Sequence, residues 1–164
     1  MLKYVTVEVT FGEVPSEVTL CINISGCTIQ CPDCHSKYLW EDIGEDLTTD
    51  TLKDFIAKNE GITCICLMGG DSQPNEIYRL AQWIKENSNL KVCWYSGAAL
   101  RNDFPSAYFD YIKTGPYKKD LGGLDSPTTN QRFYQIFPKY DINKERILYR
   151  YLEDITYKFW RENK

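Results

Sequence analysis

The sequence predicts one α/β domain with a largely parallel β-sheet. Apolar segments short enough to be buried strands alternate with two segments whose apolar residues recur at helical spacing. The chain has 164 residues, of which 43% are hydrophobic and 14% aromatic, so it can build a hydrophobic core without disulfide support. We expect a single domain over residues 1–164, with its core between about 18 and 137 and the tail 138–164 unassigned.

The first third of the chain supplies two predicted strands and a helix. Residues 4–11 alternate loosely between apolar and polar, and residues 18–24 form a second strand-like run. A cysteine-rich loop follows. A helix capped by Thr48 or Thr49 then runs to about Asn59, because its apolar residues recur on one face.

The middle of the chain supplies a second helix and three more predicted strands. Residues 62–68, 90–95 and 109–113 are short apolar runs typical of buried strands. A helix begins at Pro74, and its apolar stripe comprises Ile77, Leu80, Ala81 and Ile84. The order strand, helix, strand, helix, strand is typical of a parallel sheet with right-handed crossovers.

The pattern changes after residue 113. Residues 114–132 are rich in Gly, Pro, Asp, Thr and Asn, and so long an irregular segment inside a compact domain is usually a functional loop. Residues 134–137 resume a strand, and the tail beyond them fits either a helix or a strand. The cysteine-rich loop and the segments 69–71 and 96–97 each follow a predicted parallel strand. Because the carboxyl ends of parallel strands meet at one edge, we expect these segments to form a single site.

Charge and hydropathy exclude several function classes. There are 19 basic and 23 acidic residues, a net charge of −4, with no basic block, which argues against nucleic acid or an anionic membrane as a partner. The longest uninterrupted apolar run, residues 64–68, is far too short to cross a membrane. Residues 1–8 lack the apolar stretch of a secretory signal. We therefore expect a cytoplasmic protein.

The seven cysteines fall into two groups. Three lie within eight residues, at Cys27, Cys31 and Cys34, whereas the other four have apolar, strand-like surroundings: Cys21, Cys64, Cys66 and Cys93. An odd number cannot pair completely within the chain, and a reducing compartment disfavours structural disulfides. We expect the scattered four to be small core residues and the group of three to hold an inorganic centre.

Two metal centres compete for the spacing Cys27-x3-Cys31-x2-Cys34. Structural zinc needs four ligands, usually in two separated pairs, and the only nearby fourth candidate, His35, directly adjoins Cys34. A [4Fe–4S] cluster normally takes four cysteines, so three would leave one iron open to an exogenous amine and carboxylate. The spacing favours the cluster, with His35 supporting the loop rather than binding metal.

The cysteine loop also carries a family resemblance. The run Cys27-Thr28-Ile29-Gln30-Cys31-Pro32-Asp33-Cys34 resembles the CxxxCxxC loop of the radical S-adenosylmethionine (SAM) superfamily. The wider context resembles one branch, the activating proteins of anaerobic ribonucleoside-triphosphate reductases, from about Cys21 to Ile136. The matching segments are His35-Ser36 with Trp40, Met68-Gly69-Gly70-Asp71 with Pro74 (similar to the superfamily's GGE motif), Thr114-Gly115-Pro116-Tyr117, and Thr129-Asn130-Gln131-Arg132.

The resemblance implies a fold and a set of site residues. The fold would be an incomplete β/α barrel of the radical SAM type with a mostly parallel sheet. Cys27, Cys31 and Cys34 would hold a [4Fe–4S] cluster, whose open iron binds the amino and carboxylate groups of SAM. The residues implied in SAM binding are Gly69, Gly70, Asp71, Asn130 and Arg132.

The implied activity is the reductive cleavage of SAM to a 5′-deoxyadenosyl radical that abstracts a hydrogen atom from a glycine of another protein. That protein would be the large catalytic subunit of an anaerobic ribonucleotide reductase, and the electron donor a flavodoxin-like protein. Two alternatives stay open. One is another radical SAM enzyme, such as a 7-carboxy-7-deazaguanine synthase or the activase of a different glycyl-radical enzyme. The other is a non-catalytic, zinc-binding interaction module.

Overall fold

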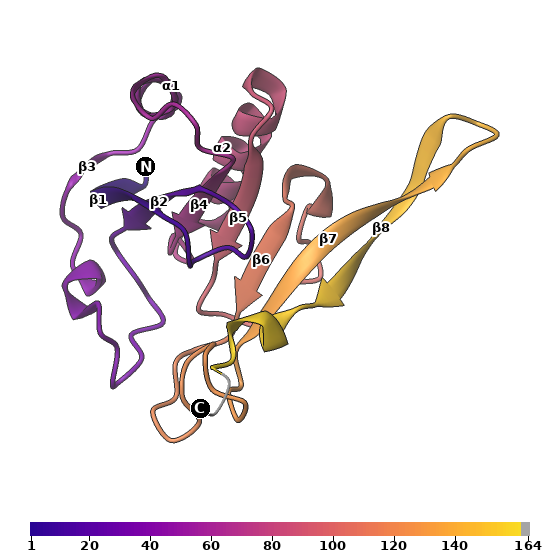
Figure 1. Cartoon of the computed structure of the whole chain (residues 1–164). Coiled ribbons are helices and arrows are strands. Elements are labelled where there is room, and N and C mark those ends of the chain that lie inside the picture. Colours follow the sequence, from indigo (N-terminus) through magenta and orange to yellow (C-terminus); the bar gives the residue numbers. More distant parts are fainter. Residues whose placement is uncertain (162–164) are drawn as a thin grey trace.

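The computed structural model describes residues 1–161, which form one eight-stranded sheet in the order β3-β1-β2-β4-β5-β6-β7-β8 (Figure 1). The strands are β1 (Lys3–Thr10), β2 (Thr19–Ile24), β3 (Glu45–Asp46), β4 (Cys64–Met68), β5 (Lys91–Tyr95), β6 (Tyr111–Thr114), β7 (Arg132–Asp141) and β8 (Arg146–Asp154). The helices of these residues are α1 (Thr49–Lys58) and α2 (Pro74–Asn87), with short 3-10 turns η1 (Lys37–Trp40), η2 (Ser106–Tyr108) and η3 (Thr156–Phe159).

The predicted β/α barrel with a mostly parallel sheet is wrong. Antiparallel pairing joins β1 to β2, β1 to β3, β6 to β7 and β7 to β8, whereas parallel pairing is confined to β2–β4, β4–β5 and β5–β6. The two α-helices of the described chain are also too few to surround a barrel, which needs a crossover helix after each parallel strand. The connections explain the difference. The links from β1 to β2 and from β7 to β8 are too short for a parallel crossover, so both pairs fold back as hairpins.

Both predicted helices are confirmed, and both cover the same face of the sheet. Thr48 caps α1 by accepting a hydrogen bond from the backbone N–H of Thr51 at 3.1 Å. Helix α2 begins at Pro74 and buries the predicted stripe of Ile77, Leu80, Ala81 and Ile84. The main core lies between these helices and alternate residues of β2, β4 and β5. Within residues 1–161, no helix combines the length and the apolar content that crossing a bilayer requires.

The four scattered cysteines are core residues, as predicted, and they lie on the opposite face of the sheet. Cys21, Cys66 and Cys93 lie in register on β2, β4 and β5, and Cys64 lies on the same face of β4. All four side chains are fully buried, in a second core with Val14, Tyr111, Phe133 and Ile155. Burial raises the pKa of the Cys93 thiol to about 11 and also raises the pKa of Cys64 and Cys66. These thiols therefore stay protonated and inert.

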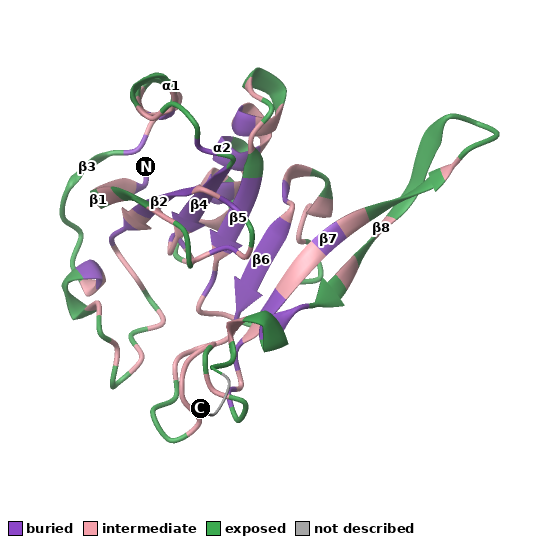
Figure 2. Cartoon of the chain, in the orientation of Figure 1, coloured by how far each residue is buried: buried purple, intermediate pink, exposed green. Residues whose placement is uncertain are grey.

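The hairpin of β7 and β8 leaves the body of the molecule and projects into solvent (Figures 1 and 2). Near its base, the rings of Phe137 and Tyr151 stack with centroids 5.6 Å apart. Beyond that pair most residues of both strands are exposed. We call residues 138–151 the arm.

Candidate functional site

Four loops meet at the carboxyl edge of the parallel strands: the three that the sequence predicts and the loop after β6. They follow β2, β4, β5 and β6, which point the same way. The backbone N–H of Gly69 donates to the carbonyl of Tyr95 at 2.9 Å, which joins the loop after β4 to the end of β5. The N–H of Tyr117 donates to Sγ of Cys31 at 3.3 Å, which joins the loop after β6 to the cysteine loop.

Backbone hydrogen bonds give the cysteine loop its shape. The N–H of Cys27 donates to the carbonyl of Leu39 at 2.9 Å, so the loop closes on the turn η1 at its buried residue. The N–H of Cys34 donates to the carbonyl of Cys31 at 3.0 Å, which forms a tight turn between the last two cysteines. Unlike the four core cysteines, all three thiols of the loop are partly exposed.

Two of these thiols accept backbone hydrogen bonds. Sγ of Cys34 accepts from the N–H of Ser36 at 3.3 Å, and Sγ of Cys31 accepts from the N–H of Tyr117. Hydrogen bonds to sulfur stabilise the thiolate, which is the form that binds metal. The loop therefore already carries the hydrogen-bond donors that a thiolate ligand requires.

Lys113 is a site residue that sequence reasoning missed. It is only 9% exposed, and its Nζ donates to the carbonyl of Gly115 at 2.8 Å and to that of Ser96 at 3.4 Å. Burial lowers its pKa to about 8, against the opposing effect of the negative charges of Asp71 and the three loop cysteines. A single Lys at the end of a predicted strand carries no sequence signal. Only the tertiary fold places it beside the cysteines.

Cysteines of the loop line two cavities among the described residues. A cavity of about 330 Å³ is lined by Cys34 and His35 together with Lys113, Tyr117 and Gln131. A second one, of about 150 Å³, is lined by Cys27, Cys34, Trp40, Met68 and Gly69. Cys34 lines both cavities, so ligands in either would lie next to the same thiol.

The three residues of the Gly-Gly-Asp segment have different positions: the first lines a cavity, and the other two are packed or hydrogen-bonded within the protein. Gly69 has φ +105° and lines the smaller cavity, whereas Gly70, with φ +83°, is buried where a Cβ atom would lie 2.5 Å from Cδ1 of Ile77. The carboxylate of Asp71 accepts hydrogen bonds from the hydroxyl of Ser96 and, at 3.0 Å, from the N–H of Gly97. Asp71 thus clamps the loop after β4 to the loop after β5. Its predicted contact with SAM remains a prediction.

The late loop brings Gln131, rather than its two predicted neighbours, to the larger cavity. Asn130 donates from Nδ2 to the carbonyl of Pro116 at 3.1 Å, and its Oδ1 is buried without a hydrogen-bond partner among the described residues. Arg132 faces elsewhere: it lies 3.8 Å from Asp154 and lines a separate pocket beside η3. The structure therefore does not bring Arg132 together with the cysteines.

The family comparison assigns a cofactor class to this edge of the sheet. Residues 16–118, which include the whole cysteine loop, match the family model described as a 4Fe-4S single cluster domain. The chain belongs to this family. No curated protein and no solved structure gives a significant match to the chain.

The residues present fit the cofactor of the 4Fe-4S single cluster family. Cys27, Cys31 and Cys34 are the accessible thiols, and two of them already accept N–H hydrogen bonds. The remaining cysteines are withdrawn into the core with raised pKa values. Three ligands from this loop are therefore available to the cluster.

The alternative of a structural zinc site receives no support. Zn–S bonds of about 2.3 Å in a tetrahedron require thiolates only about 3.8 Å apart. Among residues 1–161, no group of three Cys, His, Asp or Glu side chains is placed to hold a single metal ion. The ring of His35, the proposed fourth zinc ligand, lies against Tyr117 with centroids 5.6 Å apart. A cubane spaces its cysteines more widely, because each binds a different iron.

Proposed function

We propose that this iron–sulfur protein is a radical SAM activase that generates a glycyl radical on the large subunit of an anaerobic ribonucleotide reductase. The observation that carries the proposal is the position of Lys113. A buried ammonium group shares one cavity with Cys34 of a three-cysteine cluster loop. A cluster with one open iron and a neighbouring buried cation together suit a ligand with an amine and a carboxylate, as the methionyl end of SAM has.

Lys113 has the capacity for this contact. An ammonium group has three N–H donors. Within the described chain, two carbonyls accept from Lys113, those of Gly115 and Ser96, so one donor is left for the cavity. A carboxylate there would be held by a charge-assisted hydrogen bond, which contributes about 1.5–3 kcal/mol.

The loops after β4 and β5 would form the other wall of the nucleotide site. Gly69 lines the smaller cavity without a side chain, so a ligand can approach its backbone closely. Asp71 holds both loops in place through Ser96 and Gly97. This clamp fixes the wall before the ligand arrives, which reduces the ordering cost of binding.

When bound, the cluster would supply the electron that cleaves SAM into methionine and the radical that takes hydrogen from glycine. The protein's part is to bind, orient and shield the nucleotide. The three thiols are only partly buried, and His35 beside them is exposed, so the reacting edge lies at the surface. A surface site suits a substrate that is a segment of another protein. A flavodoxin-like protein is the proposed electron donor.

The test is anaerobic reconstitution of the full-length chain followed by EPR of the reduced protein with and without SAM. We expect iron and sulfide to be incorporated, SAM to perturb the spectrum, and a glycyl radical signal to form only when the reductase subunit is added. Cys31→Ala should abolish the SAM-dependent perturbation, whereas the matched variant Cys93→Ala, in the core, should retain it. Stoichiometric zinc in a colourless protein, or turnover of a pterin substrate in place of glycyl radical formation, would contradict the proposal.

A further inference from the structure

The arm exposes apolar side chains on both of its faces. Tyr140, Leu148 and Tyr149 are each at least half exposed, and Ile142 at the tip is 88% exposed. Ile147 and Tyr151 add further exposed apolar surface on β8. So many exposed apolar side chains on one element indicate an interaction site.

A free hairpin of this kind is also poorly stabilised by itself. Two strands without a third strand or a covering layer are at best marginally stable in water. In the arm, strand pairing between β7 and β8 and the Phe137–Tyr151 stack at its base are the internal support. β8 is an edge strand as well, so one row of its backbone groups has no strand beside it. A partner surface that covers the arm would stabilise the hairpin and shield the exposed backbone groups of β8.

The arm is basic although the chain is acidic. It carries four cations against Asp141 and Glu145, whereas the whole chain has a net charge of −4. Within residues 1–161 none of these cations forms an ion pair: Lys139, Lys144, Arg146 and Arg150. The surface that the arm contacts should therefore be acidic and partly apolar.

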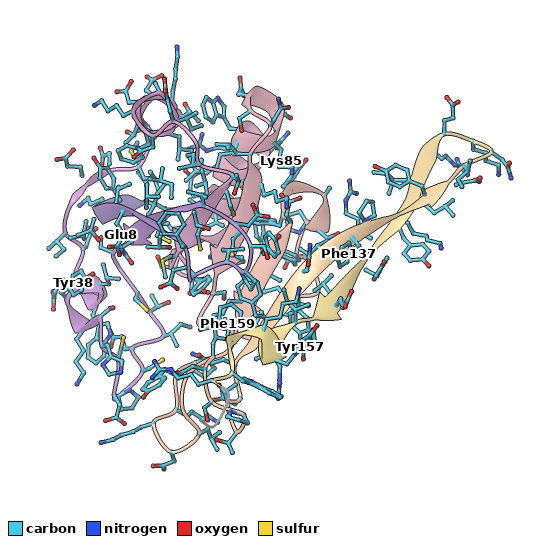
Figure 3. All side chains as sticks on the ribbon, viewed as in Figure 1. Glu8, Tyr38, Lys85, Phe137, Tyr157 and Phe159 are labelled. Atoms are coloured by element: carbon cyan, nitrogen blue, oxygen red, sulfur yellow. The ribbon has the colours of Figure 1, made fainter. Side chains whose placement is uncertain are left out.

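The opposite edge of the same sheet has this character. We call residues 41–54, which include β3 and the first half of α1, the acidic edge. Its charged residues are Glu41, Asp42, Glu45, Asp46, Asp50 and Asp54 against Lys53. Ile43 within it and the neighbouring Tyr38 are exposed apolar side chains. Figure 3 shows Tyr38 on one side of the molecule and Phe137, at the base of the arm, on the other.

We propose that two copies of the chain form a two-fold symmetric dimer in which the arm of each copy lies against the acidic edge of the other. β3 and β8 are the two ends of the sheet order, so the arm and the acidic edge are on opposite sides of one molecule. Two copies side by side and antiparallel bring each arm to the partner's acidic edge. The dimer then contains the same contact twice and closes on itself.

This dimer requires neither cluster nor nucleotide, so its test is independent of the proposed function. The experiment is sedimentation equilibrium of the full-length chain, reconstituted and kept anaerobic with reductant to prevent intermolecular disulfides. We expect a dimer of the 19.1 kDa chain whose dissociation constant rises with salt, because exposed charges are screened.

Charge reversal identifies the contact. We expect Arg146→Glu with Arg150→Glu in the arm, and separately Glu41→Lys with Asp46→Lys in the acidic edge, each to weaken the dimer at least tenfold. The matched control for the arm variant is Lys119→Glu with Lys158→Glu, which makes the same charge change at exposed positions outside both surfaces and should have a much smaller effect. All six positions retain exposed or partly exposed side chains, so folding can be checked by circular dichroism.

Mixing the two reversed variants gives the decisive result. In a heterodimer, the acidic arm of one variant meets the basic edge of the other, and the wild-type arm meets a wild-type edge. We therefore expect the mixture to dimerise more tightly than either variant alone. If the wild type is a monomer at every concentration, the proposal is overturned, and the partner of the arm is a different macromolecule. The proposal would also be overturned if the mixture dimerised no more tightly than either variant alone. The same holds if reversing the charges of the arm weakened the dimer while reversing those of the acidic edge did not.

Discussion

Gly97 offers a direct test of how the sheet positions the cysteine loop. It follows β5, and its Cα lies against Ile29, which is in the loop between Cys27 and Cys31. A Cβ atom built at Gly97 would lie 2.9 Å from Cγ1 of Ile29 and 3.2 Å from its Cβ and Cγ2. Favourable carbon–carbon contacts are about 3.5–4.0 Å, so Gly97→Ala forces the cysteine loop away from β5.

The expected cost follows from these contacts. An extra methyl group in a packed site costs about 1–3 kcal/mol, which corresponds to roughly a 5- to 150-fold shift in an equilibrium. Because the atoms in the way belong to the loop, most of this cost should fall on the loop conformation that presents the three thiols. The N–H of Gly97 that donates to Asp71 is kept in the variant. We therefore expect weaker cluster retention at nearly unchanged sheet stability.

The assay is iron and sulfide content after anaerobic reconstitution, followed over time in the presence of a chelator. We expect Gly97→Ala to lose iron faster than the wild type. The double variant Gly97→Ala with Ile29→Ala removes the contacts with Cγ1 and Cγ2, leaves the one with Cβ, and should restore part of the retention. Wild-type retention in Gly97→Ala, or no recovery in the double variant, would refute the argument that this contact positions the loop.

Three further predictions concern charge and thiol chemistry. Lys113→Gln should weaken SAM binding at least tenfold, measured by equilibrium dialysis, at unchanged iron content; an unchanged affinity would remove Lys113 from the nucleotide site. Burial alone would raise the pKa of Glu17, but hydrogen bonds from Lys91, Thr63 and Tyr111 outweigh it and lower the pKa. The ionised carboxylate therefore stabilises the fold above its unfolded pKa of about 4.3, and this stabilisation is lost as the pH falls below that value. Glu17→Gln should accordingly lower the free energy of unfolding in urea by about 1–3 kcal/mol at pH 7 and by less near pH 3, and equal losses at both pH values would contradict this. In the cluster-free protein, iodoacetamide should modify the three loop cysteines well before the four core cysteines, as followed by peptide mass spectrometry; equal rates would contradict their assignment to the core.

Local sequence signals predicted the elements of the central sheet well. Thr48 and Pro74 mark the starts of α1 and α2, and the apolar run 62–68 contains β4. These signals act within a few residues, so one sequence suffices to find them. The convergence of the loops at one edge followed from the parallel order of β2, β4 and β5.

The direction of the outer strands was not predictable in the same way. The alternation in residues 134–137 indicates a strand, but an alternating run is the same for parallel and antiparallel pairing. The β7–β8 turn lacks the Asn-Gly or Asp-Gly pair that marks a tight hairpin, and it uses Glu145 at φ +50° instead. Lys113 was missed as a cavity residue because its importance comes from contacts with segments distant in sequence.

The row of thiols on β2, β4 and β5 has a consequence for how the protein matures. In an unfolded chain all seven cysteines are open to iron, and those outside the loop outnumber those within it. Formation of the sheet buries Cys21, Cys64, Cys66 and Cys93, so that they can no longer bind a cofactor. Productive metallation must therefore come after the strands have paired, and iron delivered to a nascent chain would trap it in misligated states.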